Sequence, residues 1–118
     1  MGIGTGVGGI VKQGDVYWYT FHVPDKRRPV LLLTRNSAIP LLTGITVAPV
    51  TTVIRNIPSE VLLTVEEDAM PEDCVVNTDN IQTIQKANLG AFITQLSPEK
   101  MQEVREAIIF SLGFDNLL

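Results

Sequence analysis

The sequence predicts one small domain of the mainly β, α+β class: a barrel of five or six short strands with a C-terminal helix packed against it. The chain has 118 residues, the length of one compact domain. Short runs of apolar and β-branched residues alternate with turn residues over most of the chain. Near the C-terminus the spacing of apolar residues becomes helical. A small barrel closed by one helix is the simplest architecture for this pattern.

Six segments are expected to form strands. Residues 16–23 are rich in aromatic and β-branched side chains, and residues 30–34 are almost wholly apolar, as in a strand buried on both faces. Pro49 lies within residues 45–53 and lacks the N–H of a ladder hydrogen bond, so we expect a bulge or a sheet edge there. The other strands are residues 60–65, 74–77 and 81–84, with an acidic turn at residues 66–68.

The closing helix has clear boundaries. Ser97 is a suitable N-cap, Pro98 suits the first helical position, and Gly113 supplies the stop. Apolar residues recur at helical spacing between them, and Ile109 and Phe110 widen the apolar surface beyond one stripe. We therefore expect the helix to pack against the strands, and whether it also packs on a second side is not decided by the sequence.

The N-terminus is expected to be a flexible leader over residues 1–11, followed by the folded domain over residues 12–118. Five of the nine glycines fall in residues 1–9. Gly4, Gly6 and Gly9 satisfy the G-x-G-x-x-G pattern, but a dinucleotide site needs a strand before the glycines and a helix after them. Here a strand follows, so a nucleotide site is not expected.

Composition excludes several classes of protein. Nine Lys and Arg against thirteen Asp and Glu give a net charge of −4, which excludes a uniformly basic nucleic-acid binder but not a local basic site. One His and one Cys leave too few ligands for a usual zinc site, so we expect no metal and no cofactor.

No membrane segment or secretory signal is expected, and the single Cys74 fits a reducing cytoplasm. A mean hydropathy of +0.22 in so short a chain favours a homodimer.

Few residues are candidates for chemistry. The only concentration of positive charge in the sequence is the expected loop at Lys26, Arg27 and Arg28. Two interpretations stay open: these side chains form a solvated turn, or they bind a phosphate. The third strand ends with Thr51 and Thr52. Their hydroxyls can donate to a phosphate oxygen, or the two residues are there only because threonine is a good strand former.

Two further side chains titrate or react but have a simpler explanation. His22 is the sole imidazole, and at a strand end it is more often structural than catalytic. Cys74 is surrounded by apolar residues and has no second His to serve as its base, so we expect a small core residue.

Five sequence blocks combine into one pattern. Residues 14–18 read Gly-Asp-Val-Tyr-Trp, residues 28–33 read Arg-Pro-Val-Leu-Leu-Leu, and residues 47–52 read Val-Ala-Pro-Val-Thr-Thr. Residues 74–84 form the fourth block, and residues 89–114 the fifth, from Leu-Gly to the end of the helix. In order and spacing, these blocks resemble the MazF/PemK-type toxins of bacterial toxin–antitoxin pairs over about residues 12–114.

The resemblance implies an SH3-like barrel, a homodimer and a metal-independent endoribonuclease that cleaves single-stranded mRNA at defined sequences and so arrests growth. The family's catalytic pair falls on Arg28 and Thr51, with His22 as the reserve candidate for proton transfer. Cleavage without metal uses the RNA 2′-hydroxyl and leaves a 2′,3′-cyclic phosphate. The expected partners are RNA and an antitoxin with an acidic C-terminal tail, which alone links the toxin to operator DNA in the bacterial cytoplasm. The expected RNA-binding residues are Lys26, Arg27, Arg35, Thr52, Arg55, Asp79 and Asn80.

Two departures and two alternatives accompany this resemblance. The loop between the first two strands is short, so the RNA preference should differ. Asp79 stands where the family often has Glu, which shortens its reach toward RNA. A gyrase poison of the CcdB type shares the barrel, but its gyrase contact resembles a C-terminal Trp-Gly-Ile, whereas residues 114–118 here read Phe-Asp-Asn-Leu-Leu. The second alternative is an inert SH3-like interaction module, which would leave Arg28 and Thr51 without a role.

Overall fold

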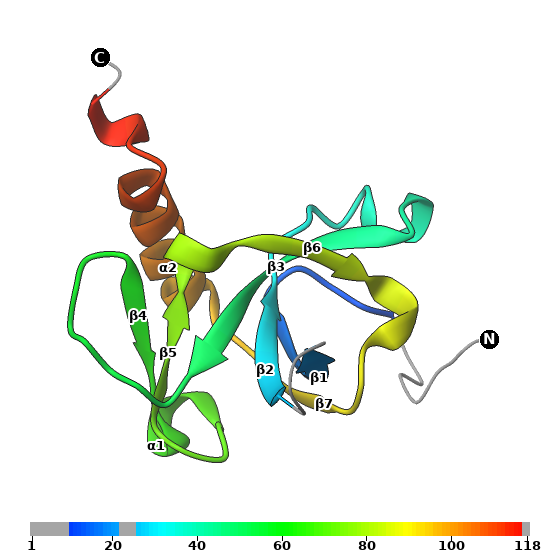
Figure 1. Cartoon of the computed structure of the whole chain (residues 1–118), viewed down its shortest axis with the longest axis horizontal. Coiled ribbons are helices and arrows are strands. Elements are labelled where there is room, and N and C mark those ends of the chain that lie inside the picture. The colour runs from blue at the N-terminus through cyan, green and yellow to red at the C-terminus, as the bar shows by residue number, and fades with distance from the viewer. Residues whose placement is uncertain (1–9, 22–25, 117–118) are drawn as a thin grey trace.

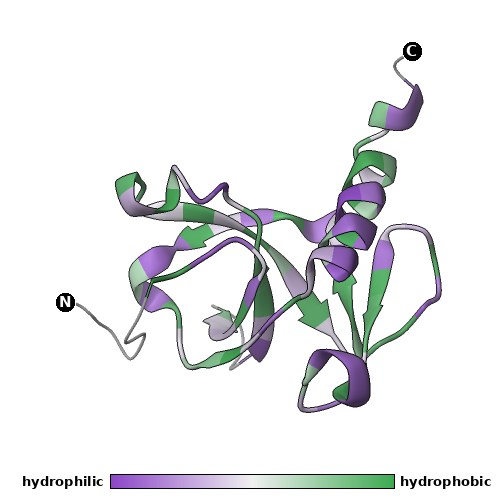
Figure 2. Ribbon diagram, turned by 180° about the vertical axis from the view of Figure 1, so that it is seen from behind, coloured by the Kyte–Doolittle hydropathy of each residue, from purple (hydrophilic) through white to green (hydrophobic). Residues whose placement is uncertain are grey.

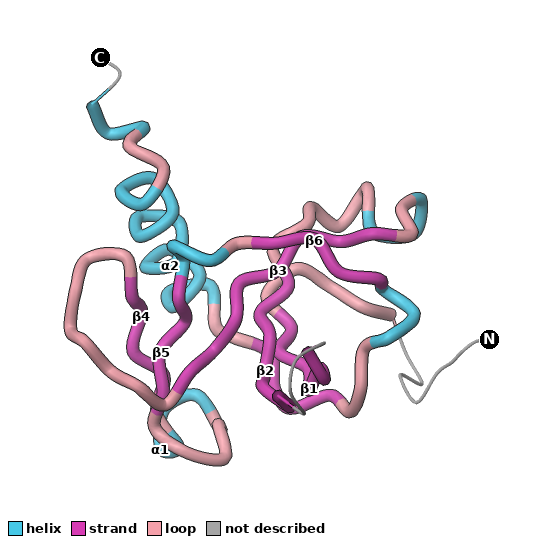
Figure 3. Tube along the Cα trace, viewed as in Figure 1, coloured by secondary structure: helices cyan, strands magenta, loops and turns pink. Residues whose placement is uncertain are grey.

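A computed structural model describes residues 10–21 and 26–116, which form a mainly antiparallel β half-barrel with a helix packed against it. Figures 1 and 3 show two groups of strands joined by the long β3, with α2 beside β4 and β5. The elements are β1 (Asp15–Phe21), β2 (Lys26–Leu32), β3 (Gly44–Thr51), β4 (Glu60–Leu63), α1 (Val65–Asp68), β5 (Cys74–Asn77), β6 (Gln82–Gln85), β7 (Phe92–Gln95) and α2 (Pro98–Ser111). Short 3₁₀ turns occupy Ile39–Leu41, Thr78–Asn80, Lys86–Asn88 and Phe114–Asn116.

The strand β3 organises the sheet. The strand order is β4-β5-β3-β2-β1-β7, and β6 also pairs with β3. On one side of β3, Val30 of β2 lies opposite Pro49. On its other side β6 pairs with Gly44–Val47 and β5 pairs from Val50 onward, so within the described chain Pro49 has no ladder partner there. Pro49 therefore occupies a short stretch of free edge, at the point where β3 changes its partner on this side from β6 to β5.

The core lies on both faces of the central strands. Val30 and Leu32 pack in one apolar cluster with Ile45 and Ile84. Leu31, between them in sequence, points to the other face and joins the cluster that contains Val104 of α2. This alternation explains why residues 30–32 read as an unbroken apolar run, as predicted for a strand buried on both faces.

Among the described residues, the helix α2 packs on one side only. Its N-cap is Ser97, whose hydroxyl accepts a hydrogen bond from the N–H of Lys100 at 3.0 Å. Val104 and Ala107 are buried, whereas Phe110 remains 47% exposed. Figure 2 shows hydrophobic residues concentrated in the last turns of the helix. No described helix is long and apolar enough to cross a membrane.

The predicted fold class is confirmed, with several local differences. Lys26–Arg28 are not in a loop: they begin β2, because their backbones pair with residues 19–21 of β1 although their side chains are polar. The acidic turn is the helix α1, since the hydroxyl of Thr64 accepts from the N–H of Glu67 and caps it. The short β7 was not predicted and completes the sheet beside β1. Residues 1–9 of the expected leader lie outside the described residues, while Val11 packs against the second cluster.

Candidate active site

Arg28 and Thr51 occupy facing positions where two neighbouring strands part. The register of β2 and β3 pairs Leu32 with Val47 and Val30 with Pro49. Continued by two residues, this register places Arg28 opposite Thr51 on the same face. The pairing of β2 with β3 ends at Val30 and Pro49, however, while on its other side β3 still pairs with β5 at Thr51. The two side chains therefore border an opening on the β2 side of β3, where the ladder between β2 and β3 has ended.

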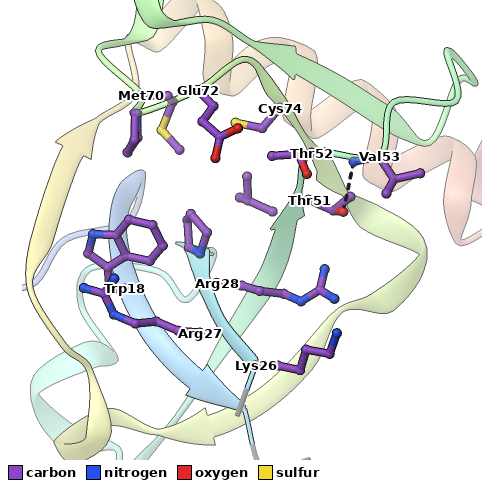
Figure 4. A pocket seen from close by; sticks show the side chains of 13 residues that line it. Trp18, Lys26, Arg27, Arg28, Thr51, Thr52, Val53, Met70, Glu72 and Cys74 are labelled. Carbon is purple, nitrogen blue, oxygen red and sulfur yellow. Dashed lines mark hydrogen bonds between the residues drawn. The ribbon is translucent and has the colours of Figure 1, made fainter. Parts of the chain in front are cut away.

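Two adjoining hollows meet at this opening. The first has a volume of about 380 Å³ and extends from Trp18 to Thr52 and Glu72. The second has a volume of about 430 Å³ and extends from Phe21 to Arg55 and Asn80. The end of β2 lies between them, and four residues line both hollows: Lys26, Arg28, Thr51 and Val53. Figure 4 shows Arg28 and Lys26 on one side of the first hollow and Glu72 and Met70 on the other.

The hydroxyl of Thr51 is oriented by the backbone N–H of the second residue after it. Its oxygen accepts a hydrogen bond from the N–H of Val53 at 3.2 Å, drawn as the dashed line in Figure 4. A hydroxyl that accepts one bond retains its hydrogen for donation to another group. Thr51 therefore presents a donor to the opening from the end of a strand, opposite the Arg28 side chain.

The guanidinium of Arg28 is available for an anion. Its side chain is half-buried, and no ion pair formed within the described residues involves it. A guanidinium offers several N–H donors in a plane that matches two phosphate oxygens. Together with the Thr51 hydroxyl, it forms a set of donors that suits a tetrahedral or five-coordinate phosphate.

Arg27 belongs to a different part of the site from its neighbour. Side chains alternate along a strand, so Arg27 lies on the Trp18 face of the sheet and Arg28 on the other. The guanidinium carbon of Arg27 lies 4.1 Å from the centroid of the Trp18 ring, a cation–π contact. The expected basic cluster is thus divided between two faces at the end of β2.

Trp18 is held in place through its backbone. Its N–H donates to the carbonyl of Ala91 at 2.9 Å, and its carbonyl accepts from the N–H of Gly90 at 2.7 Å. A Cβ on Gly90 would lie 2.9 Å from the Trp18 carbonyl oxygen, so this close approach requires glycine. The indole wall of the first hollow is therefore fixed by the segment that precedes β7.

Comparison with known proteins shows the family of the chain. The family model described as PemK-like, MazF-like toxin of type II toxin–antitoxin system matches residues 12–112. The chain belongs to this family. It is 35% identical over 103 residues to the probable endoribonuclease MazF2 of Mycobacterium tuberculosis, covering 87% of this chain and 99% of that protein. It is 42% identical over 84 residues to the endoribonuclease MazF3 of the same species, covering 71% and 81% of the two chains.

Solved structures of MazF proteins share the fold. The Mycobacterium tuberculosis toxin MazF-mt6 matches with a TM-score of 0.76 and 35% identity, over 84% of this chain and 96% of that one. A mycobacterial endoribonuclease solved in complex with its cognate antitoxin matches with a TM-score of 0.76 and 26% identity, over 87% and 95%. The chain is thus homologous to MazF endoribonucleases, as the resemblance predicts.

Most of the expected RNA-binding residues of this MazF-family chain meet at the two hollows. Lys26, Arg27 and Thr52 line the first, and Arg55 and Asn80 line the second. Arg55 is held by Glu60, whose buried carboxylate accepts from the Arg55 backbone N–H at 2.9 Å and lies 3.6 Å from its guanidinium. Sequence reasoning missed Glu60, because nothing in the local pattern marks its burial.

Of the remaining expected residues, two line neither hollow and one lies outside the described residues. Arg35 follows the opposite end of β2 and lines neither hollow. The Asp79 carboxylate accepts from the Ser59 hydroxyl at 2.6 Å and so ties two loops together. His22 lies outside the described residues. Within the described ranges, no three His, Cys, Asp or Glu side chains are grouped to hold a metal ion.

The wall of the first hollow includes a thiol that stays neutral. Cys74 is 3% exposed. Burial, and then the nearby carboxylates of Asp73, Asp68 and Glu72, raise the pKa of its thiol to about 11. At neutral pH it is therefore a packed core residue rather than a nucleophile, in agreement with the interpretation from sequence.

Proposed function

We propose that residues 12–118 form a toxin that cleaves single-stranded mRNA at defined sequences without a metal ion, with Arg28 and Thr51 acting on the scissile phosphate. The observation that supports this is the placement of a guanidinium and a hydroxyl donor at facing positions between two hollows. The proposal applies to this chain the activity named for its MazF relatives.

The reaction requires no group beyond the RNA and the protein. The 2′-hydroxyl oxygen attacks phosphorus, and the bond from phosphorus to the 5′ oxygen of the next nucleotide breaks. One proton leaves the 2′ oxygen and one reaches the 5′ oxygen, giving a 2′,3′-cyclic phosphate and a 5′-hydroxyl. Negative charge accumulates on the non-bridging oxygens in between, where fixed donors stabilise it most effectively.

Arg28 and Thr51 have different roles in this scheme. The Arg28 guanidinium, a planar cation with several N–H donors, stabilises the charge on the five-coordinate phosphorus. The Thr51 hydroxyl donates a hydrogen bond to a non-bridging oxygen. Proton transfer falls to Arg28 as general acid, with His22 as the reserve candidate.

RNA affinity is concentrated in one groove of an otherwise acidic protein. The two hollows flank the proposed phosphate position, so nucleotides on either side of the cut can occupy them. Lys26, Arg27 and Arg55 supply positive charge along this path. Such a groove suits single-stranded RNA, whose bases are free to stack and to hydrogen-bond.

The proposed partners follow the same logic. We expect an antitoxin with an acidic C-terminal tail to bind across residues 26–28 and exclude RNA, because both seek the same cations. Operator DNA is contacted only through that antitoxin, and the toxin itself acts as a homodimer in the bacterial cytoplasm. A related mycobacterial endoribonuclease has been solved with its cognate antitoxin.

The test is incubation of the protein with a long RNA in excess EDTA. We expect fragments that end in a 2′,3′-cyclic phosphate and begin with a 5′-hydroxyl, produced by the wild-type protein and strongly reduced in Arg28→Ala. Intact RNA together with inhibition of DNA gyrase would instead favour the gyrase poison. Intact RNA without gyrase inhibition would leave the interaction module.

A further inference from the structure

The first hollow combines an aromatic platform with a carboxylate that forms no ion pair with another described residue. Trp18 and Arg27 stack on one side of it, and Figure 4 shows the Glu72 side chain projecting into it from the other. We propose that this hollow binds a guanine base of the RNA, next to the scissile phosphate, and that Glu72 determines the preference for guanine. This inference rests on the proposed function and specifies its substrate.

The platform is built for stacking. An indole with a guanidinium 4.1 Å from its centroid offers flat surfaces that hold a base by π and cation–π contact. The ring is half-buried, and its backbone is fixed by hydrogen bonds to Gly90 and Ala91, so little order is gained on binding. Stacking of this kind strengthens binding by about tenfold to a hundredfold per base and does not distinguish one base from another.

The distinction comes from Glu72. Its side chain is exposed, and none of the ion pairs within the described residues involves it. An ionised carboxylate has two acceptor oxygens and no donor. It can therefore satisfy a base edge only where that edge presents hydrogen-bond donors.

Guanine alone presents two adjacent donors on its Watson–Crick edge, N1–H and N2–H, which fit the two oxygens of one carboxylate. Adenine and cytosine each place an acceptor beside their amino group, and uracil places a carbonyl on both sides of its single N–H. Those acceptors would repel the Glu72 oxygens, and each polar group left unpaired on binding would be costly. Single-stranded RNA leaves this edge available.

The location couples base recognition to the reaction. Arg28 and Thr51 line the same hollow as Trp18 and Glu72, so a base held there lies beside the proposed phosphate position. The volume of about 380 Å³ is within the range of small-ligand sites. Apolar side chains of Pro29 and Met70 complete the wall and limit the water that competes for the base.

The first experiment maps cut sites on a transcript pool by sequencing the 5′ ends of the fragments. We expect guanine to be enriched at one fixed position beside the cut for the wild-type protein. Glu72→Gln keeps the shape but replaces one acceptor by a donor, and should reduce the ratio of kcat/KM for guanine over adenine at that position by about tenfold or more. Glu66→Gln removes the same charge from a nearby residue that does not line this hollow and should keep the wild-type pattern.

The second experiment measures binding without cleavage. Trp18 is the only tryptophan of the chain, so its fluorescence reports directly on stacking. The probes are heptamers of deoxyuridine, with or without one deoxyguanosine at each position in turn, which lack the attacking 2′-hydroxyl. From the concentration dependence of the quenching, we expect one guanine-containing heptamer to bind with a Kd at least tenfold lower than that of the uridine heptamer. Glu72→Gln should remove that difference in Kd.

The outcomes separate the two proposals. Intact RNA with the wild-type protein, but guanine-dependent quenching that requires Glu72, overturns the proposed cleavage and keeps the guanine site. Cleavage with a cut-site pattern that Glu72→Gln leaves unchanged overturns the guanine site and keeps the cleavage. Quenching by all heptamers alike also overturns it, because the hollow would then stack bases without reading them. If only an acidic antitoxin peptide quenches Trp18, the hollow serves that protein and the guanine site is wrong.

Discussion

The buried carboxylate of Glu60 holds the backbone of Arg55 from five residues away. Its Oε1 accepts from the N–H groups of Arg55 at 2.9 Å and Asn56 at 3.1 Å, and its Oε2 lies 3.6 Å from the Arg55 guanidinium. The Glu60 side chain is 2% exposed, whereas that of Arg55 is 58% exposed. Asn56 has a positive φ of 61°, a conformation that this carboxylate helps to fix. The loop that carries Arg55 into the second hollow is therefore set by an anion beneath it.

The first prediction follows from this asymmetry. Glu60→Gln should lower the free energy of unfolding by about 1–3 kcal/mol, because two backbone N–H groups lose a charged acceptor. Arg55→Ala should cost less than about 1 kcal/mol, since its guanidinium is exposed and the pair is long. Urea denaturation of both variants checks this, and an equal or larger loss in Arg55→Ala would contradict it.

The second prediction concerns Arg28. Arg28→Ala should reduce the cleavage rate by about 10²–10³ or more, the cost of losing a main donor to the developing charge. Arg28→Lys should restore only part, because a point charge keeps the attraction and loses the planar pair of donors. Single-turnover cleavage of a defined RNA measures both.

Arg27→Ala is the matched control for Arg28. It removes the same charge from the next residue, on the Trp18 face, and should mainly weaken RNA binding and flatten its salt dependence. If Arg27→Ala and Arg28→Ala lost the same activity and both recovered at low salt, Arg28 would belong only to the electrostatic groove.

The third prediction concerns Thr51. Thr51→Val keeps the shape of the side chain and removes the donor, so the cleavage rate should fall by about tenfold to a hundredfold, as for a hydrogen bond to a charged group. Stability should change little, because the hydrogen bond that Thr51 accepts from Val53 is exposed. Thr83→Val is the control at an exposed strand hydroxyl that lines neither hollow, and an equal loss of rate there would count against a specific role for Thr51.

The fourth prediction concerns pH and Cys74. The folded protein keeps this thiol protonated up to a pKa of about 11, whereas the unfolded chain ionises it near the ordinary value of 9.0. Its contribution to stability is therefore complete below about pH 9 and is lost as the pH rises toward 11, in all about 2–3 kcal/mol. Tyr17, whose pKa burial and Asp15 raise to about 12, adds a similar loss at higher pH.

Urea denaturation from pH 8 to 11 tests this with Cys74→Ala as the reference. Tyr17 titrates in both proteins, so the difference between their pH profiles isolates the thiol. The wild-type protein should lose stability faster than the variant over this range. Parallel profiles would show that the thiol ionises equally in the folded and unfolded chains.

The fifth prediction concerns assembly. Exposed apolar side chains just beyond the end of α2, among them Leu112 at 53% and Phe114 at 55%, add to a chain of positive mean hydropathy. Sedimentation at micromolar concentration should give twice the mass of the 12.9 kDa chain. A single monomeric species over that range would rule out the homodimer.

Local sequence patterns were sufficient for most of the fold. Strands and helix ends are determined by interactions within a few residues, and the sequence shows them as β-branched runs, the Ser97 cap and the Gly113 stop. Lys26–Arg28 were misplaced because a strand can begin with polar residues when its backbone has a partner, and the partner is remote in sequence. The strand β7 escaped detection because it is short and mostly exposed or half-buried.

The site depends on information that only the register of the strands contains. Arg28 and Thr51 could be named from their blocks, but their facing positions follow from the pairing of β2 with β3. The contact of Trp18 with Arg27 likewise follows from the antiparallel register of β1 and β2. Glu72 follows Pro71 in a connecting segment with no periodic pattern, so no sequence signal connects it to Trp18.

The close approach of Gly90 to Trp18 also makes the recognition surface adjustable from a distance. A side chain at position 90 would displace the Trp18 carbonyl, which it would meet at 2.9 Å, and with it the indole plane. In this chain, a substitution at position 90 would therefore alter stacking at the proposed base site through Trp18, from a segment that lines neither hollow. Arg28 and Thr51 lie on other strands and would keep their positions, so the base preference would change while the proposed phosphate site is retained.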